Sequence, residues 1–196
     1  MVAVQHEKDG RSRILTTARD LFATKGFHQT SMAQLASAAQ VSVGQIYRLF
    51  KGKEDIIEAL VQSDSNAWNA DMVVLRTKLE AGALSLEQTF EQLLLHGTES
   101  EKDEAFSFDI LAESFRNEAV GETIATLCAG FRAILRDFAC IANPDLSGEA
   151  LDAAEELILA CMFGFGHRSV SRPKLSAQRA ARRGAQMIVA GLKAVH

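Results

Sequence analysis

The sequence predicts an all-α fold. Apolar residues recur at spacings of three and four along nearly the whole chain, and the alternating β-branched runs typical of strands are absent. The two prolines are Pro144 and Pro173, so residues 1–143 contain none that would interrupt a helix. With 196 residues, the chain is long enough to bury a core without disulfides or metals.

Capping and breaking residues divide the chain into about nine predicted helices. Residues 1–10 are polar and are expected to form a flexible tail, after which the first helix runs to Gly26. Ser31 and Ser42 are suitable N-cap residues for two short helices, the second of which covers residues 43–50. We expect the other helices at residues 53–81, 85–96, 106–115, 119–141, 147–170 and 176–196, with a polar joint at residues 97–104.

Charge is distributed unevenly along the chain. The formal net charge is −4, which by itself argues against a polyanionic partner. Residues 11–53, however, contain seven lysines and arginines and one acid, whereas the rest of the chain contains 14 basic and 24 acidic residues. We therefore expect a basic cap that attracts nucleic acid and an acidic body that is kept away from it.

Residues 27–53 have the pattern of a helix-turn-helix, in which two short helices are separated by a tight joint. Such a unit places its second helix in the major groove of DNA. Gln45 suits a bidentate contact with adenine, and Val43 can touch a thymine methyl group. Phe50 is expected to be a core residue, whereas Tyr47 either packs beside it or presents its hydroxyl to a phosphate, and we expect the second. The other groups suited to phosphate contacts are the side chains of Arg48, Lys51 and Lys53.

A specific motif covers Arg11 to about Ile57. It reads R-S-R-I-L-x-x-A-x-x-L-F-x-x-x-G-F-x-x-T-S-M-x-x-L-A-x-x-A-x-V-S-x-G-x-I-Y-x-x-F-x-x-K-E. This motif resembles the N-terminal domain of the tetracycline-repressor (TetR) family of bacterial transcription regulators. In that family the Thr-Ser pair, the recognition helix, the Tyr of Y-x-x-F and the following Lys contact operator DNA. The expected DNA-contacting residues are therefore Thr30, Ser31, Ser42, Val43, Gly44, Gln45, Tyr47, Arg48, Lys51 and Lys53.

Gln40 departs from the family pattern, which usually has Gly in the turn between the two helices. A Gln at this position must take the left-handed conformation, or the turn must tilt, at a cost on the order of 1 kcal/mol. We expect the turn to change slightly without loss of DNA binding.

The resemblance implies a DNA-binding domain at residues 11–55 and a helical effector-binding and dimerisation domain at residues 56–196. In the family the last two helices form the dimer interface. Here the last predicted helix carries a stripe of small residues that would allow a second helix to approach closely. The alternative is that such stripes close the core of the monomer; we expect a homodimer, which also suits a palindromic operator. The expected interface residues are Leu157, Ile158, Cys161, Phe165, Ala181, Gly184, Ile188 and Gly191.

An effector pocket is expected between the fourth and seventh helices. Asp64 and Asp71 flank Trp68 at helical spacing, so this group could bind a cationic ligand; otherwise the carboxylates are solvated and the apolar stripe is core. Glu113 could hold a polar ligand group, although a surface pair with Arg116 is the expected arrangement. The predicted pocket residues are Asp64, Trp68, Asp71, Met72, Phe106, Ile110, Glu113, Cys128 and Phe131.

Patterns for other kinds of site are absent from the sequence. The cysteines Cys128, Cys140 and Cys161 are widely spaced and are expected to be reduced, packed thiols. We find no nucleophile with its base, no Gly-rich phosphate loop and no metal-ligand spacing, so we expect no enzyme activity, no cofactor and no metal. The lack of a long apolar run and of a secretory signal predicts a cytoplasmic protein that does not enter the membrane.

The function predicted from the sequence is that of a dimeric transcriptional repressor. It binds double-stranded DNA and is released from a palindromic operator by a small, largely apolar effector. The fourth helix is the expected lever between the two activities, because it begins at the DNA-binding module and continues into the predicted pocket. One alternative is an activator or chromosome-organising protein whose C-terminal domain binds a protein partner. Another is a helical carrier or enzyme with a vestigial N-terminal unit.

Overall fold

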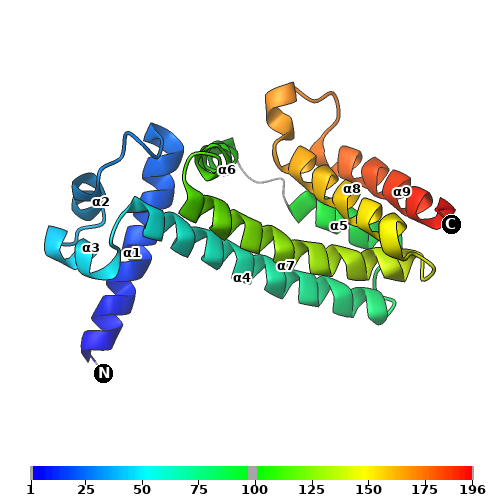
Figure 1. Ribbon diagram of the computed structural model, residues 1–196, viewed down its shortest axis with the longest axis horizontal. Helices are drawn as coiled ribbons and strands as arrows, with labels where there is room; N and C mark the ends of the chain where they lie inside the picture. The colour runs from blue at the N-terminus through cyan, green and yellow to red at the C-terminus, as the bar shows by residue number, and fades with distance from the viewer. Residues whose placement is uncertain (1, 97–100, 196) are drawn as a thin grey trace. The chain divides into compact units, whose positions relative to one another are not determined.

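The computed structural model describes the backbone of residues 2–96 and 101–195, and the side chains of residues 9–96 and 104–195. Over these residues the chain is helical and contains no strand, which confirms the predicted all-α class (Figure 1). The elements are α1 (Val2–Lys25), α2 (Met32–Ala38), α3 (Val43–Leu49), α4 (Lys53–Glu80), α5 (Leu86–His96), α6 (Glu101–Ser114), α7 (Glu118–Ala142), α8 (Gly148–Gly166), the 3-10 helix η1 (Arg168–Ser171) and α9 (Ala177–Ala194).

Most helix ends lie where the capping residues predict them. The hydroxyl oxygens of Ser31, Ser42, Ser85 and Ser176 each accept a backbone N–H from the third residue that follows, at 3.1–3.3 Å. Gly82 follows the end of α4 with a φ of 69°, a left-handed conformation that glycine adopts without steric cost.

Three helix ends differ from the prediction. Helix α1 begins at Val2 and not after residue 10, because a polar composition without proline does not prevent a helix. Helix α6 begins at Glu101, inside the predicted polar joint, whose residues 97–100 lie outside the described residues. Helix α8 ends at Gly166, and the chain then tightens into η1, which closes at Arg172 with a φ of 50°.

The described residues form two compact units. The first comprises residues 2–65 and 101–127, and the second comprises residues 66–96 and 128–195. This division differs from the predicted boundary between residues 55 and 56, because the first unit also contains α6. The ring of Phe106 on α6 stacks on that of Phe22 on α1, with centroids 6.3 Å apart, so α6 completes the N-terminal core.

The core of the second unit is built around α5, which lies against α8 and α9. Phe90, Leu93 and Leu94 of α5 are fully buried there. All described helices are too short or too polar to cross a membrane.

A buried ionic cluster joins α7 to α8 within the second unit. Glu155 is 6% exposed, and its carboxylate accepts hydrogen bonds from Arg132 at 2.6 Å and from Arg136 at 2.9 Å. Burial raises the pKa of Glu155, but the hydrogen bonds from both arginines outweigh burial and hold the pKa below its ordinary value of 4.5. Glu155 is therefore ionised in the folded chain at neutral pH.

Candidate nucleic-acid interface

Helices α2 and α3 form a helix-turn-helix whose local geometry follows from its polar residues. Ser31 and Gln34 make a reciprocal capping box at the start of α2, in which the Ser31 N–H also donates to Gln34 Oε1 at 2.8 Å. After α2, Gln40 takes a φ of 55°, so of the two expected alternatives it adopts the left-handed conformation. The Val41 N–H then donates to Ala36 O at 3.0 Å, which completes the turn into α3.

Helix α3 has a buried face and an exposed face. Ile46 is fully buried in the core of the first unit. Val43 and Tyr47 are 51% and 53% exposed, although both are large and largely apolar, and Arg48 is exposed as well. A Cβ at Gly44 would meet no atom within 4 Å, so the backbone is open to close approach there. These four positions were predicted to face outward; Gln45, also predicted to do so, is half-buried.

The structure changes the predicted role of Thr30. Its side chain is 1% exposed, and its hydroxyl donates to the Gly26 carbonyl at 2.9 Å. A hydroxyl that is used inside the turn does not reach a phosphate, so the predicted DNA contact of this side chain is not supported. The neighbouring Ser31 is exposed. Its hydroxyl oxygen acts only as an acceptor in the capping box, so its O–H remains available to donate to another group.

Lys53 is likewise engaged inside the first unit. Its ammonium donates to the Phe27 carbonyl at 2.7 Å and lies 4.3 Å from the centroid of the Phe27 ring. The structure therefore gives Lys53 a structural role inside the first unit, and the phosphate contact predicted for it stays a prediction. The side chain of Lys51 is exposed, which leaves it in a better position to contact a phosphate.

Two carboxylates of α6 hold the same turn from its other side. The Phe27 N–H donates to Asp109 Oδ2 at 3.0 Å, and His28 Nε2 lies 2.8 Å from Glu113 Oε2. Glu113 is only 5% exposed. It was predicted to line an effector pocket or to pair with Arg116, but it belongs to the anchor of the helix-turn-helix. The sequence carries no signal for either contact, since the partners lie on distant segments.

The predicted effector-binding residues are divided between the two units. Asp64 belongs to the first unit and forms an ion pair with Arg19, so the predicted attraction of Asp64 for a cationic ligand is already satisfied within the chain. Phe106 and Ile110 are buried in the core of the same unit, as is Glu113 beside His28. The remaining five, Trp68, Asp71, Met72, Cys128 and Phe131, belong to the second unit.

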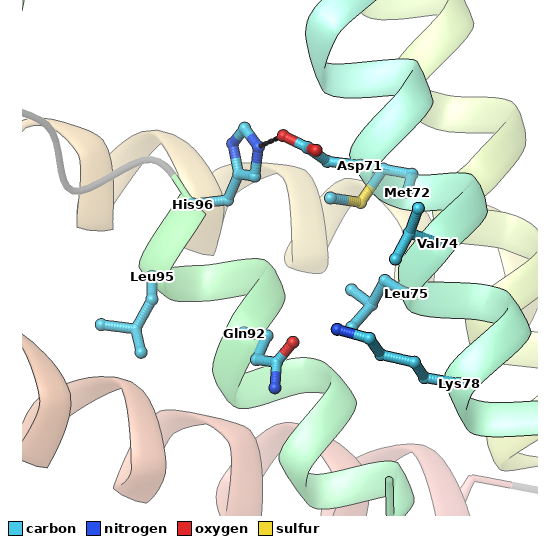
Figure 2. Close-up of a pocket in the computed structure, with 8 residues that line it drawn as sticks. All are labelled: Asp71, Met72, Val74, Leu75, Lys78, Gln92, Leu95 and His96. Atoms are coloured by element: carbon cyan, nitrogen blue, oxygen red, sulfur yellow. Dashed lines mark hydrogen bonds and ion pairs between the residues drawn. The ribbon is translucent and has the colours of Figure 1, made fainter. Parts of the chain in front are cut away.

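A groove in the second unit lies between α4 and α5 (Figure 2). Its volume is about 360 Å³, and of the predicted pocket residues it includes Asp71 and Met72. Asp71 Oδ2 lies 2.8 Å from His96 Nε2 across the groove, as the dashed line in Figure 2 marks. Trp68 instead packs on Phe131, with ring centroids 4.1 Å apart, in the core. The lining residues are Asp71, Met72, Val74, Leu75, Lys78, Gln92, Leu95 and His96.

The cysteines of the second unit resemble packed thiols. Burial raises the pKa of Cys128, although Arg132 opposes the shift, and burial raises the pKa of Cys161. All three cysteines, including Cys140, are half-buried and unpaired with one another in disulfides. Within the described ranges, His, Cys, Asp and Glu side chains nowhere gather in threes that could hold a metal.

Several predicted dimer residues lie inside the chain's own core. Ile158 and Ala181 are fully buried, and Ile188 is 7% exposed. A Cβ at Gly184 would stand 3.1 Å from both Leu94 and Phe165, so this glycine allows α9 to pack closely within the monomer. For these positions the stripe closes the monomer core, which was the alternative left open by the sequence.

Two of the predicted dimer residues remain at the surface. Leu157 is 57% exposed on α8, and Gly191 is exposed on α9 with no atom within 4 Å of a Cβ placed there. Cys161 is half-buried. The sequence did not indicate Met187, which is 75% exposed on α9.

Comparison with known proteins matches the helix-turn-helix segment to one family. Residues 14–60 match the family described as bacterial regulatory proteins, tetR family. The HTH-type transcriptional regulator UidR of Escherichia coli strain K12 is 30% identical over 110 residues, which are 56% of this chain and 54% of UidR. The chain thus spans about half the length of the curated relatives it matches.

Solved structures show the same fold over nearly the whole chain. Salmonella enterica GusR has a TM-score of 0.66 and 24% identity, covering 92% of this chain and 95% of GusR. Bacillus subtilis FadR in complex with stearoyl-CoA has a TM-score of 0.71 and 16% identity, covering 94% of this chain and 99% of FadR. The helix-turn-helix geometry and the family match coincide on α1 to α4, and over residues 14–60 the chain is similar to the TetR family of bacterial regulatory proteins.

Proposed function

We propose that the chain is a DNA-binding transcriptional regulator, acting as a dimeric, cytoplasmic repressor that leaves a palindromic operator when a small, largely apolar effector binds. The observation that carries the proposal is the exposed face of α3. Val43, Gly44, Tyr47 and Arg48 are all open to solvent on a helix that Ile46 holds in the core. A helix presented in this way can enter the major groove.

The exposed side chains supply the two kinds of contact that operator binding needs. Val43 provides methyl groups for a thymine, and Gly44 lets the backbone come close to the base edges. The Tyr47 hydroxyl and the side chains of Arg48 and Lys51 are suited to the phosphates on either side. The excess of positive charge in residues 11–53 supports this orientation, because it attracts the polyanion to this part of the chain.

A second copy would bind the outer faces of α8 and α9. Leu157 and Met187 are 57% and 75% exposed, and large exposed apolar side chains often mark a contact surface. Gly191 leaves α9 open to close approach by another helix. A two-fold dimer would carry one copy of α3 for each half of a palindrome.

The groove between α4 and α5 is the proposed effector site. Met72 and Leu75 give it an apolar floor, His96 adds a polar group, and its size suits a small ligand. Helix α4 carries Met72 and Leu75 and also Lys53, which holds the turn before α2. A ligand that prefers one position of α4 can therefore favour a conformation with lower affinity for DNA.

The proposal is tested by mobility-shift titration with a duplex selected from a random-sequence library by the unmodified chain. Val43→Ala should relax the preference at one base pair of each half-site. Lys51→Ala should weaken binding to all duplexes. It should also reduce the steepness of the plot of log binding constant against log salt concentration by about 0.9. Lys174→Ala removes an exposed lysine from the turn before α9 and should change neither quantity.

Two results would overturn this function. The first is that the unmodified chain selects no duplex from the library. The second is that Lys51→Ala and Lys174→Ala bind all duplexes equally well at every salt concentration, because the basic surface beside α3 would then have no role.

A further inference from the structure

Gly10 lies in the interior of α1, where glycine is less favourable than alanine. The position is buried. A Cβ placed there would stand 2.7 Å from Nε2 and 3.8 Å from Cδ of Gln45, and apart from the adjoining residues and backbone of α1 no other described atom lies within 4 Å of it. The missing side chain at Gly10 therefore makes room for one group, the amide of Gln45 on α3.

This close approach belongs to a packed contact between α1 and α3. The guanidinium of Arg11, the next residue of α1, lies 5.2 Å from the centroid of the Phe50 ring at the end of α3. One turn further along α1, Ile14 is fully buried in the same core cluster as Ile46. The distance between Gly10 and Gln45 is thus set by neighbouring contacts on both helices.

The contact accounts for the half-buried state of Gln45, which differs from the open positions around it on α3. A free glutamine side chain samples many rotamers, whereas pairing with adenine requires both ends of its amide to be presented in one orientation. We propose that Gly10 is a positioning residue for base recognition: the space it leaves lets Gln45 lie along α1 and sets the direction in which its amide is presented. This inference rests on the proposed DNA-binding function.

Gly10→Ala removes that space without harming the fold. The atom that a new methyl group would meet is the end of a flexible side chain, so Gln45 turns away and the backbone stays in place. Alanine is also the better helix former, so thermal stability should be unchanged or slightly higher. Discrimination at the base pair read by Gln45 should fall about tenfold, because its bidentate contact is lost.

The experiment compares Gly10→Ala, Gln45→Ala and the double variant on the selected duplex and on versions with one base pair changed at each position. The two single variants should lose discrimination at the same base pair, and the double variant should lose no more than either. Gly130→Ala is the matched control, because it adds a methyl group to an exposed helical glycine with no atom within 4 Å. Equal weakening on every duplex, loss at a different base pair, or a Gly10→Ala effect that persists without Gln45 would overturn the inference.

A second measurement separates this inference from the proposed function. In the DNA-free protein, the NMR signal of the Gln45 side-chain amide, assigned with Gln45→Ala, should move in Gly10→Ala and stay in Gly130→Ala. An unmoved signal in Gly10→Ala refutes the contact, whether or not the chain binds DNA. A moved signal in a chain that selects no duplex removes the recognition role together with the proposed function, and leaves the contact itself intact.

Discussion

Replacing Lys53 by methionine distinguishes a structural lysine from a phosphate contact. The substitution keeps the apolar stem and removes the ammonium, which donates to the Phe27 carbonyl at 2.7 Å and lies 4.3 Å above the Phe27 ring. A hydrogen bond from a charged group contributes about 1.5–3 kcal/mol. A cation over an aromatic ring at a partly exposed site contributes about 0.5–1 kcal/mol. Because Lys53 is only half-buried, we take the lower end of each of these two ranges. We therefore expect the free energy of unfolding to fall by about 2 kcal/mol.

Urea unfolding measures this loss. With a denaturant dependence of about 1–3 kcal/mol per molar, the midpoint should fall by about 1 M. Tyr47 is the single tyrosine and lies in the first unit, whereas Trp68 is the single tryptophan and lies in the second. Tyrosine fluorescence should therefore report the shift, with the tryptophan signal as an internal comparison.

Lys51→Met is the matched control, because Lys51 has an exposed side chain in the same segment. Its free energy of unfolding should change by no more than an ordinary surface substitution causes, about 0.5 kcal/mol. If Lys53→Met unfolds at the midpoint of the unmodified chain and only weakens duplex binding, the ammonium is a phosphate contact and the structural assignment is refuted.

Two further predictions concern packing and charge. Gly121→Ala should destabilise the chain by about 1–3 kcal/mol, because its Cβ would stand 2.9 Å from the Ser114 carbonyl oxygen, which belongs to the backbone. Gly130→Ala, on the same helix with open space around it, should stabilise by up to about 1 kcal/mol; urea unfolding that shows the same sign for both refutes the contact. Because the pKa of Glu155 is lowered on folding, its carboxylate stabilises the fold in full above pH 4.5. This stabilisation is lost as the pH falls through the pKa that Glu155 has in the folded chain. The difference in unfolding free energy between the unmodified chain and Glu155→Gln should stay constant from pH 7 to about pH 4.5 and shrink as the pH falls further, and a difference that stays constant below pH 4.5 would contradict this.

The features that the sequence predicts well are those formed by residues close together in the chain. Each serine cap depends on a backbone N–H three residues away, and the left-handed conformation of Gln40 was one of the two alternatives expected at this turn. The division of α3 into a buried and an exposed face likewise follows from helical periodicity, which correctly separates the buried Ile46 from the exposed Val43 and Tyr47. Local geometry and local spacing were sufficient for these.

The features that the sequence misses depend on partners from distant segments. The ion pair of Asp64 with Arg19 spans 45 positions, and the hydrogen bond from Lys53 to Phe27 spans 26. The bond from the Phe27 N–H to Asp109 spans 82. Helical spacing places such side chains on a face of their own helix, but it does not identify the element that packs on that face.

The reassigned cation and anion share one chemical reason. An ammonium finds the same hydrogen-bond geometry at a backbone carbonyl as at a phosphate oxygen, so residue type alone does not distinguish the two for Lys53. A carboxylate beside an aromatic residue is equally suited to a ligand cation and to an arginine of the same chain, as Asp64 and Arg19 illustrate. A charged side chain keeps its capacity for a partner only where the fold supplies none, since the Asp64 side chain is 52% exposed and is still paired with Arg19. On that criterion the lysine best suited to a phosphate is Lys51, and a phosphate-contact assignment is strongest for cations that the fold leaves exposed beside the recognition helix.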